Sequence, residues 1–92
     1  MRYQLTYSSS ARHSLKRLPR EVMLKVVNAL QALADEENPR IYLKELQGSD
    51  NPPFYSLRIG QYRVVMTIVD GEMVIHVIEV GHRGVYIGSF ET

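Results

Sequence analysis

YRVVMTIVDGEMVIHVIEV, residues 62–80, is the most strongly patterned stretch of the sequence. Apolar and β-branched residues dominate 62–69 and again 73–80, and each run has the length of a strand. The Asp70-Gly71 pair between them is the strongest short signal for a hairpin turn. We therefore expect two antiparallel strands here, with alternate residues on opposite faces. In the first strand, one face carries Tyr62, Val64, Met66 and Ile68, and the other carries Arg63, Val65, Thr67 and Val69.

Two more strands are predicted outside this hairpin. Residues 2–7 alternate apolar and polar side chains, as a half-buried strand does. Residues 54–59, FYSLRI, form a short run that turns at Gly60-Gln61 into the strand at 62–69. The stretch GSDNPP at 48–53 is rich in turn-forming residues and predicts a loop.

Two helices are predicted between the first strand and residue 38. Ser8, Ser9 and Ser10 are good N-cap residues for a helix that runs to about Leu18. Pro19 ends this helix and suits the first turn of the next one, which covers about residues 20–37. The second helix has an apolar stripe at helical spacing, and Asn38-Pro39 ends it.

Length and composition indicate one α+β domain over residues 1–92. We expect the N-terminal strand and a two-helix hairpin packed on one face of a small, mainly antiparallel sheet. The chain has no cysteine, which excludes disulfides and thiolate zinc sites, and its three histidines are too scattered to predict a metal or cofactor site. No apolar run reaches the roughly 20 residues of a membrane span, and the start MRYQLTYSSS lacks a signal-peptide apolar block. We therefore expect a cytoplasmic protein that binds no membrane.

Basic residues are concentrated near the N-terminus. The net charge is only +1, yet residues 1–20 contain five basic and no acidic residues. Four of them lie on or next to the first predicted helix: Arg12, Lys16, Arg17 and Arg20. They form either an ordinary solvated face or a surface that contacts RNA phosphates.

A second set of basic residues lies on the predicted strands and just after them. If the strands pair in sequence order, Arg58, Arg63 and Arg83 converge with Tyr86 at one end of the sheet, and His82 lies beside them. Guanidinium groups bind phosphate oxygens and stabilise developing negative charge. Tyr86 or His82 could transfer a proton or stack on a base. The alternative is that the arginines are solvated outward-facing residues, that Tyr86 anchors the tail and that His82 supports the turn.

Several short motifs in this order resemble the RelE/ParE toxin superfamily. They are Leu46-Gln47-Gly48, Phe54-Tyr55-Ser56-Leu57-Arg58, Gly60-Gln61-Tyr62-Arg63-Val64-Val65 and Val80-Gly81-His82-Arg83, with Tyr86 three residues later. The leading strand, the two helices and the total length are also similar to this superfamily. The resemblance therefore covers nearly the whole chain.

The resemblance implies a RelE-like toxin of a type II toxin–antitoxin system. RelE-type toxins bind the ribosomal A site and cleave mRNA without a metal, through attack of a 2′-hydroxyl on the adjacent phosphate. Carried over by position, Arg63 and Arg83 correspond to phosphate-binding arginines, and Arg58 to a basic residue that helps hold the reacting group. Tyr86 corresponds to a C-terminal tyrosine, and His82 to a position where some members have a catalytic histidine.

The resemblance also implies a partner, an acidic RelB-like antitoxin that folds as it binds. An apolar stripe on the face away from the helices, at Val65, Thr67 and Val69, is expected to leave surface for such a partner. Two features favour other activities: Ser56 stands where the RelE branch has a lysine, and the net charge is low for a ribosome-binding protein. The alternatives are a ParE-like inhibitor of DNA gyrase and a catalytically silent member that binds only its antitoxin.

Overall fold

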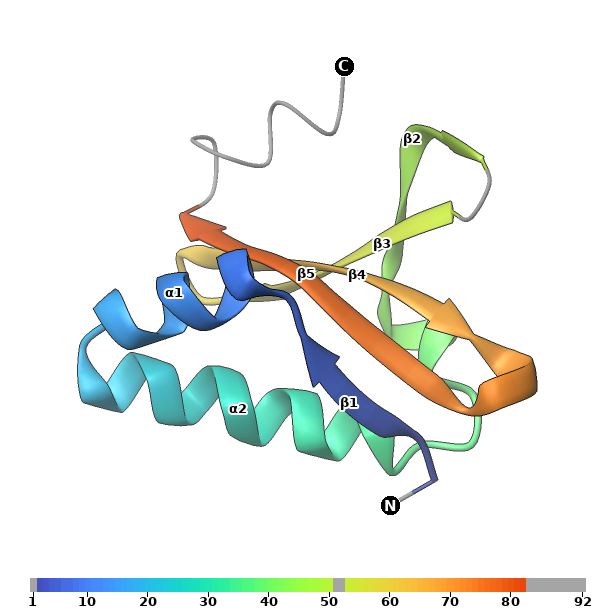
Figure 1. Ribbon diagram of the computed structural model, residues 1–92, viewed down its shortest axis with the longest axis horizontal. Helices are drawn as coiled ribbons and strands as arrows, with labels where there is room; N and C mark the ends of the chain where they lie inside the picture. The colour runs from blue at the N-terminus through green and yellow to red at the C-terminus, as the bar shows by residue number, and fades with distance from the viewer. Residues whose placement is uncertain (1, 51–52, 83–92) are drawn as a thin grey trace.

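The computed structural model describes residues 2–50 and 53–82, with the backbone alone for residues 47–50. Figure 1 shows the helices and strands in their order along the chain. They are β1 (Gln4–Tyr7), α1 (Ser9–Arg17), α2 (Arg20–Ala34), the 3₁₀ helix η1 (Pro39–Tyr42), β2 (Lys44–Asp50), β3 (Pro53–Ile59), β4 (Tyr62–Val69), the 3₁₀ helix η2 (Asp70–Glu72) and β5 (Val74–His82).

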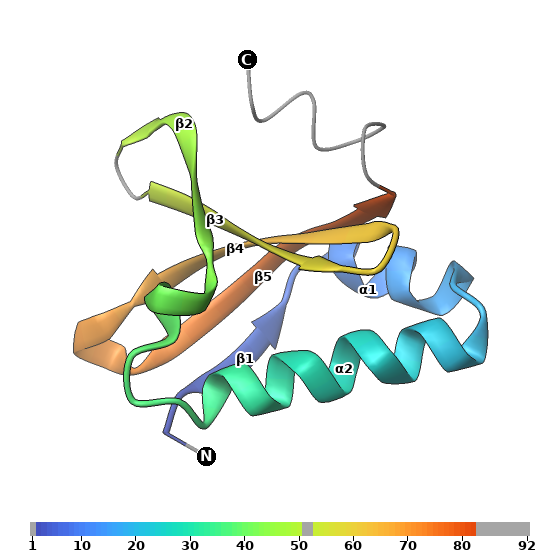
Figure 2. The same ribbon diagram turned by 180° about the vertical axis from the view of Figure 1, so that it is seen from behind.

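The strands form one sheet in the order β1-β5-β4-β3-β2. Strands β2 to β5 pair antiparallel in sequence order, and β1 pairs parallel with β5 at the edge. Both helices lie on one side of the sheet, as the two opposite views in Figures 1 and 2 show. This arrangement confirms the predicted α+β fold class.

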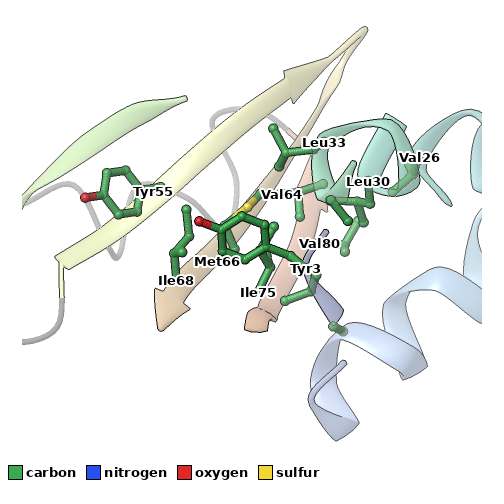
Figure 3. Close-up of a cluster of buried hydrophobic side chains, with 13 residues drawn as sticks. Tyr3, Val26, Leu30, Leu33, Tyr55, Val64, Met66, Ile68, Ile75 and Val80 are labelled. Carbon is green, nitrogen blue, oxygen red and sulfur yellow. The ribbon is translucent and has the colours of Figure 1, made fainter. Parts of the chain in front are cut away.

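The main core lies between α2 and the middle of the sheet (Figure 3). Val26, Leu30 and Leu33 follow the helical spacing of the predicted stripe, and they pack in one cluster with Val64 and Met66 of β4. All five side chains are at most 4% exposed. The face of β4 that carries Val64 and Met66 is therefore the core face, and it faces the helices as the alternation predicted.

Hydrogen bonds fix the start of α1 and the end of α2. The Ser8 hydroxyl accepts a hydrogen bond from the Ala11 N–H at 3.0 Å and donates one to the Ile78 carbonyl at 2.5 Å, so it caps α1 and attaches it to β5. Helix α2 ends at Ala34, three residues earlier than predicted. The Ala34 carbonyl accepts hydrogen bonds from the N–H groups of Arg2 and Tyr3 instead of continuing the helix.

The predicted loop at 48–53 is wrong, because β2 continues to Asp50 and β3 begins at Pro53. The β2–β3 register shifts between Glu45 and Asp50. An irregular strand of this kind does not need strictly alternating apolar and polar residues. The polar sequence of β2 therefore gave no strand pattern that could be recognised.

The β4–β5 hairpin is confirmed, but its turn is longer than the predicted two residues. Asp70–Glu72 form η2, and Met73 has the left-handed conformation with φ 55°. Strand β5 also contains a bulge, since Val65 pairs with Glu79 while Met66 pairs with Val77. The extra residue lets Val77 and Val80, three positions apart, both reach the core.

A second, smaller core lies on the other face of the sheet. Leu46 of β2 and Phe54 of β3 pack against Val65 of β4, which is fully buried. Thr67 is only 6% exposed. The expectation that Val65 and Thr67 leave an open apolar stripe for a partner is therefore wrong, because β2 and β3 supply the side chains that cover Val65.

Among the described residues, no helix has both the length and the apolar character needed to cross a membrane.

Candidate functional site

A basic hollow of about 320 Å³ lies where β2, β3 and β4 meet, on the side of the sheet away from the helices. Its lining consists of residues 41–44, Ser56, Arg58 and Arg63; we call it the basic hollow. Pairing between strands brings these residues together: Arg58 lies directly opposite Arg63, and Lys44 lies directly opposite Ser56. Three neighbouring strands thus contribute one cation each.

The alternation within β3 explains why these side chains share a face. Tyr55, Leu57 and Ile59 point toward the helix side and pack in or against the main core. The residues between them, Ser56 and Arg58, must therefore point to the opposite side. Ser56 is 5% exposed and forms the floor of the basic hollow, whereas Arg58 is exposed.

The charge arrangement favours an anion. Two like charges placed directly opposite on neighbouring strands destabilise the pair. Within the described residues, no carboxylate lines the basic hollow, and neither Lys44 nor Arg58 forms an ion pair. A phosphodiester would bring negative charge to these cations, and arginine binds phosphate oxygens through paired N–H donors.

The wall of the basic hollow is apolar. Ile41 and Tyr42 belong to η1 and are 68% and 54% exposed, although both are large hydrophobic residues. A cationic groove beside exposed apolar or aromatic side chains is the combination that single-stranded nucleic acids need, because phosphates and bases are bound together.

His82 lies at the same end of the sheet as Arg58 and Arg63, as expected, but on the other face. His82 pairs with Tyr62, and the two rings make an edge-to-face contact with their centroids 5.4 Å apart. Both line a separate hollow against α1, together with His13 and Arg17. Tyr62 shares its face of β4 with the core residues, so His82 lies on the helix side of the sheet. Arg83 and Tyr86 lie outside the described residues.

The four basic residues at the start of the helical region do not form one patch. Arg12 and Lys16 border a groove between β1, α1 and α2, as their i, i+4 spacing predicts. Arg17 borders the hollow of His82 instead. Arg20 is exposed at the first residue of α2.

The sequence analysis missed two features of this site. Lys44 was not singled out because β2 itself was not predicted. Arg40 was missed because its partners are distant in the sequence: its Nε donates to the Tyr55 hydroxyl at 2.9 Å and its Nη1 donates to Asp70 at 2.8 Å. The Tyr3 hydroxyl also donates to Asp70 at 3.2 Å. No local pattern signals such contacts.

This Arg40 network shifts the pKa of Asp70 and of Tyr3 and holds η1 beside the sheet. The hydrogen bond from Arg40 lowers the pKa of the Asp70 carboxyl. Burial, followed by the hydrogen bond to Asp70, raises the pKa of Tyr3. Because Arg40 lies in η1, these bonds position the segment that forms the apolar wall.

In the part of the chain that the structure describes, no three His, Asp or Glu side chains are grouped so that they could hold a metal ion.

Known structures share this architecture. A chain of the toxin–antitoxin complex RelBE2 from Mycobacterium tuberculosis is 27% identical, with a TM-score of 0.76 over 90% of this chain and 100% of that one. A chain of the archaeal RelE–RelB complex from Pyrococcus horikoshii is 24% identical, with a TM-score of 0.76 over 92% and 99%. A mutant of the Escherichia coli toxin RelE in the free state is 22% identical, with a TM-score of 0.77 over 99% and 95%.

Sequence comparison leads to the same superfamily. No curated protein matches the sequence. Residues 5–85 match the family described as the ParE toxin of the type II toxin–antitoxin system parDE. This match covers most of the chain and confirms the resemblance seen in the short motifs. The chain therefore belongs to the ParE toxin family of type II toxin–antitoxin systems, within the RelE/ParE superfamily.

Proposed function

We propose that this protein is a ribosome-dependent mRNA endoribonuclease of the RelE type, which inhibits translation. The observation that carries the proposal is the basic hollow, where Lys44, Arg58 and Arg63 meet beside the exposed apolar wall of η1. Cations from three strands on one face suit a phosphodiester better than a protein surface composed of mixed charges.

In the proposed reaction, the 2′-hydroxyl oxygen attacks the adjacent phosphorus and the bond to the 5′-oxygen breaks. The 2′-hydroxyl loses its proton and the leaving 5′-oxygen gains one, which gives a 2′,3′-cyclic phosphate and a 5′-hydroxyl without a metal. Arg63 and Arg83 would stabilise the charge on the phosphate oxygens, and Arg58 would hold the reacting group. Tyr86 would stack on a base or assist proton transfer. His82 receives no step, because it lies on the opposite face from Arg58 and Arg63.

The proposed partners follow from the same function. Arg12, Lys16, Arg17 and Arg20 are all exposed and would contact phosphates of ribosomal RNA around the A site. An acidic RelB-like antitoxin would neutralise the toxin and fold as it binds. Support for the antitoxin comes from the solved complexes, in which the similar chains are crystallised as RelE–RelB pairs.

The test is primer extension on a defined mRNA in a cell-free translation reaction with matched ribosomes. The wild-type protein should make discrete cuts that require ribosomes. Arg63→Ala and Arg83→Ala should each reduce the cleavage rate by about 10²- to 10³-fold, the effect of removing one charge-stabilising donor. Naked RNA without ribosomes is the control for contaminating nuclease. Cleavage near the wild-type rate in both variants would contradict the assigned site.

A second candidate is inhibition of DNA gyrase, which the match to the ParE family favours. Loss of gyrase supercoiling activity with intact mRNA would support this candidate and overturn the nuclease proposal. If both assays show no effect, the remaining candidate is a silent member that only binds its antitoxin.

A further inference from the structure

The floor of the basic hollow lacks a long side chain. Ser56 is 5% exposed, and its short hydroxyl cannot extend from the floor to a ligand at the mouth. Lys44 is its partner in the β2–β3 register and also lines the hollow. Side chains of directly opposed residues lie on the same face, with their Cβ atoms about 5 Å apart. The Lys44 side chain can therefore reach across the space that the small Ser56 leaves open.

Lys44 differs from the other basic residue of this segment. Arg40, four residues earlier, is committed to Asp70 and Tyr55. Lys44 is exposed, and none of the described acidic residues forms an ion pair with it. Of these two cations, Lys44 is the one whose charge remains available to a ligand of the basic hollow.

The strand that carries Lys44 is also held in place. Leu46, two residues later, is 2% exposed and packs with Phe54 and Val65 in the smaller core. Residues two apart in a strand share a face, so Lys44 and Leu46 belong to the same side of the sheet. The backbone at Lys44 is thus positioned by packing on one side of it and by pairing with Ser56 across from it.

We propose that Lys44 is a phosphate-binding residue of the basic hollow, which adds from β2 a third cation to those of Arg58 and Arg63. The proposal rests on the proposed nuclease function. Arg58 and Arg63 bring rigid planar donors to the phosphate, whereas the Lys44 ammonium acts as a compact charge on a flexible stem. Together the three side chains surround one phosphodiester, and Lys44 makes no proton transfer.

Single-turnover cleavage on programmed ribosomes tests this role with four variants. Lys44→Ala and Lys44→Gln should each slow cleavage at least tenfold, and Lys44→Arg should remain within about threefold of wild type because it keeps the charge. Lys25→Ala is the matched control, since Lys25 is an exposed lysine of α2 outside the proposed site, and it should stay within twofold. Equal urea midpoints will show that the variants are folded.

Equilibrium binding separates this inference from the nuclease proposal. The probe is a short single-stranded RNA with 2′-deoxy substitutions that block cleavage, and its affinity is measured by fluorescence anisotropy at several salt concentrations. Loss of one phosphate contact should reduce the slope of log affinity against log salt by about 0.7. Lys44→Ala should show this reduction, and Lys25→Ala should not.

The outcomes are distinct. Wild-type cleavage that persists unchanged in Lys44→Ala overturns the role of Lys44 and leaves the nuclease proposal intact. If the wild-type protein does not cleave, the nuclease proposal fails, and the salt slopes then decide: a reduced slope in Lys44→Ala supports the phosphate contact, whereas equal slopes or absence of binding overturn it.

Discussion

Arg58 and Arg63 lie directly opposite each other in the antiparallel β3–β4 pair, on the face of the sheet that the helices leave uncovered. Like charges in this position repel each other, and aligned pairs of opposite charge or of apolar residues are the stabilising ones. An anion bound between the two guanidinium groups would offset this repulsion.

Neutralising Arg58 should make the protein more stable and at the same time less active. We expect Arg58→Gln to raise the free energy of unfolding by about 0.5 kcal/mol, the scale of a cross-strand pair, while mRNA cleavage decreases. Urea denaturation at low ionic strength measures the first effect. The gain should shrink in 1 M salt, where charges are screened. A variant less stable than wild type at low salt would contradict this interpretation of the pair.

The smaller core should be needed for both folding and function. Leu46→Ala removes a buried side chain that packs with Phe54 and Val65, so it should lower the free energy of unfolding by about 2–4 kcal/mol. Because β2 carries Lys44, cleavage by the folded fraction should also fall. Denaturant unfolding and single-turnover kinetics measure the two effects. Leu24→Ala is the control, since Leu24 is 44% exposed and should change little.

The Arg40–Asp70 pair should make stability depend on acid pH. The hydrogen bond from Arg40 lowers the pKa of Asp70 below its ordinary value of 3.8, so the folded state favours the carboxylate. The stabilisation is fully present above pH 3.8, declines as the pH falls below it, and is lost below the folded-state pKa. Asp70 is 61% exposed, so solvent screening keeps the effect small.

This pH dependence can be measured by urea unfolding between pH 2.5 and pH 6, which compares wild type with Asp70→Asn. The difference in free energy of unfolding should be largest near pH 6 and should narrow as the carboxyl becomes protonated in both states of the wild type. A difference that grows toward low pH would show that the sign is wrong.

The cap of α1 should stabilise the junction between this helix and the sheet. Ser8→Ala removes the hydrogen bond from the Ala11 N–H and the bond to the Ile78 carbonyl, and we expect a loss of about 1–2 kcal/mol. Amide hydrogen exchange should report faster opening at Ala11. Ser9→Ala, at an exposed neighbour, is the matched control. Equal exchange in the two variants would refute the capping role of Ser8.

Local patterns were sufficient to predict both helices and four of the five strands that the structure describes, all except β2. The apolar stripe of α2, the serines before α1 and the alternation of β4 each arise from contacts between near neighbours or from the geometry of a single element. The β4–β5 hairpin was predictable for the same reason, although its turn at Asp70–Glu72 is longer. These features need only the periodicity of the chain.

Long-range pairing accounts for what could not be predicted. Strand β2 has a polar, irregular sequence, so its existence and the position of Lys44 depend on pairing with β3. Arg40 reaches Tyr55 and Asp70 only after three separate segments, η1, β3 and η2, have come together. In β5, simple alternation would place Val77 and Val80 on opposite faces. The bulge between them puts both side chains in the core, and it is set by the pairing with β4.

The candidate site was likewise predictable in part from the sequence and in part only from the pairing of strands. The amino-acid sequence specified which residues carry charge, and its motifs were enough to indicate the toxin superfamily and to mark Arg58 and Arg63. Whether those side chains meet depends on the cross-strand register, which places Arg58 against Arg63 and Lys44 against Ser56. The same register turns His82 to the helix side with Tyr62. Because neighbouring residues of a strand face opposite sides, a site on a sheet is assembled by pairing between strands, which no single stretch of sequence contains.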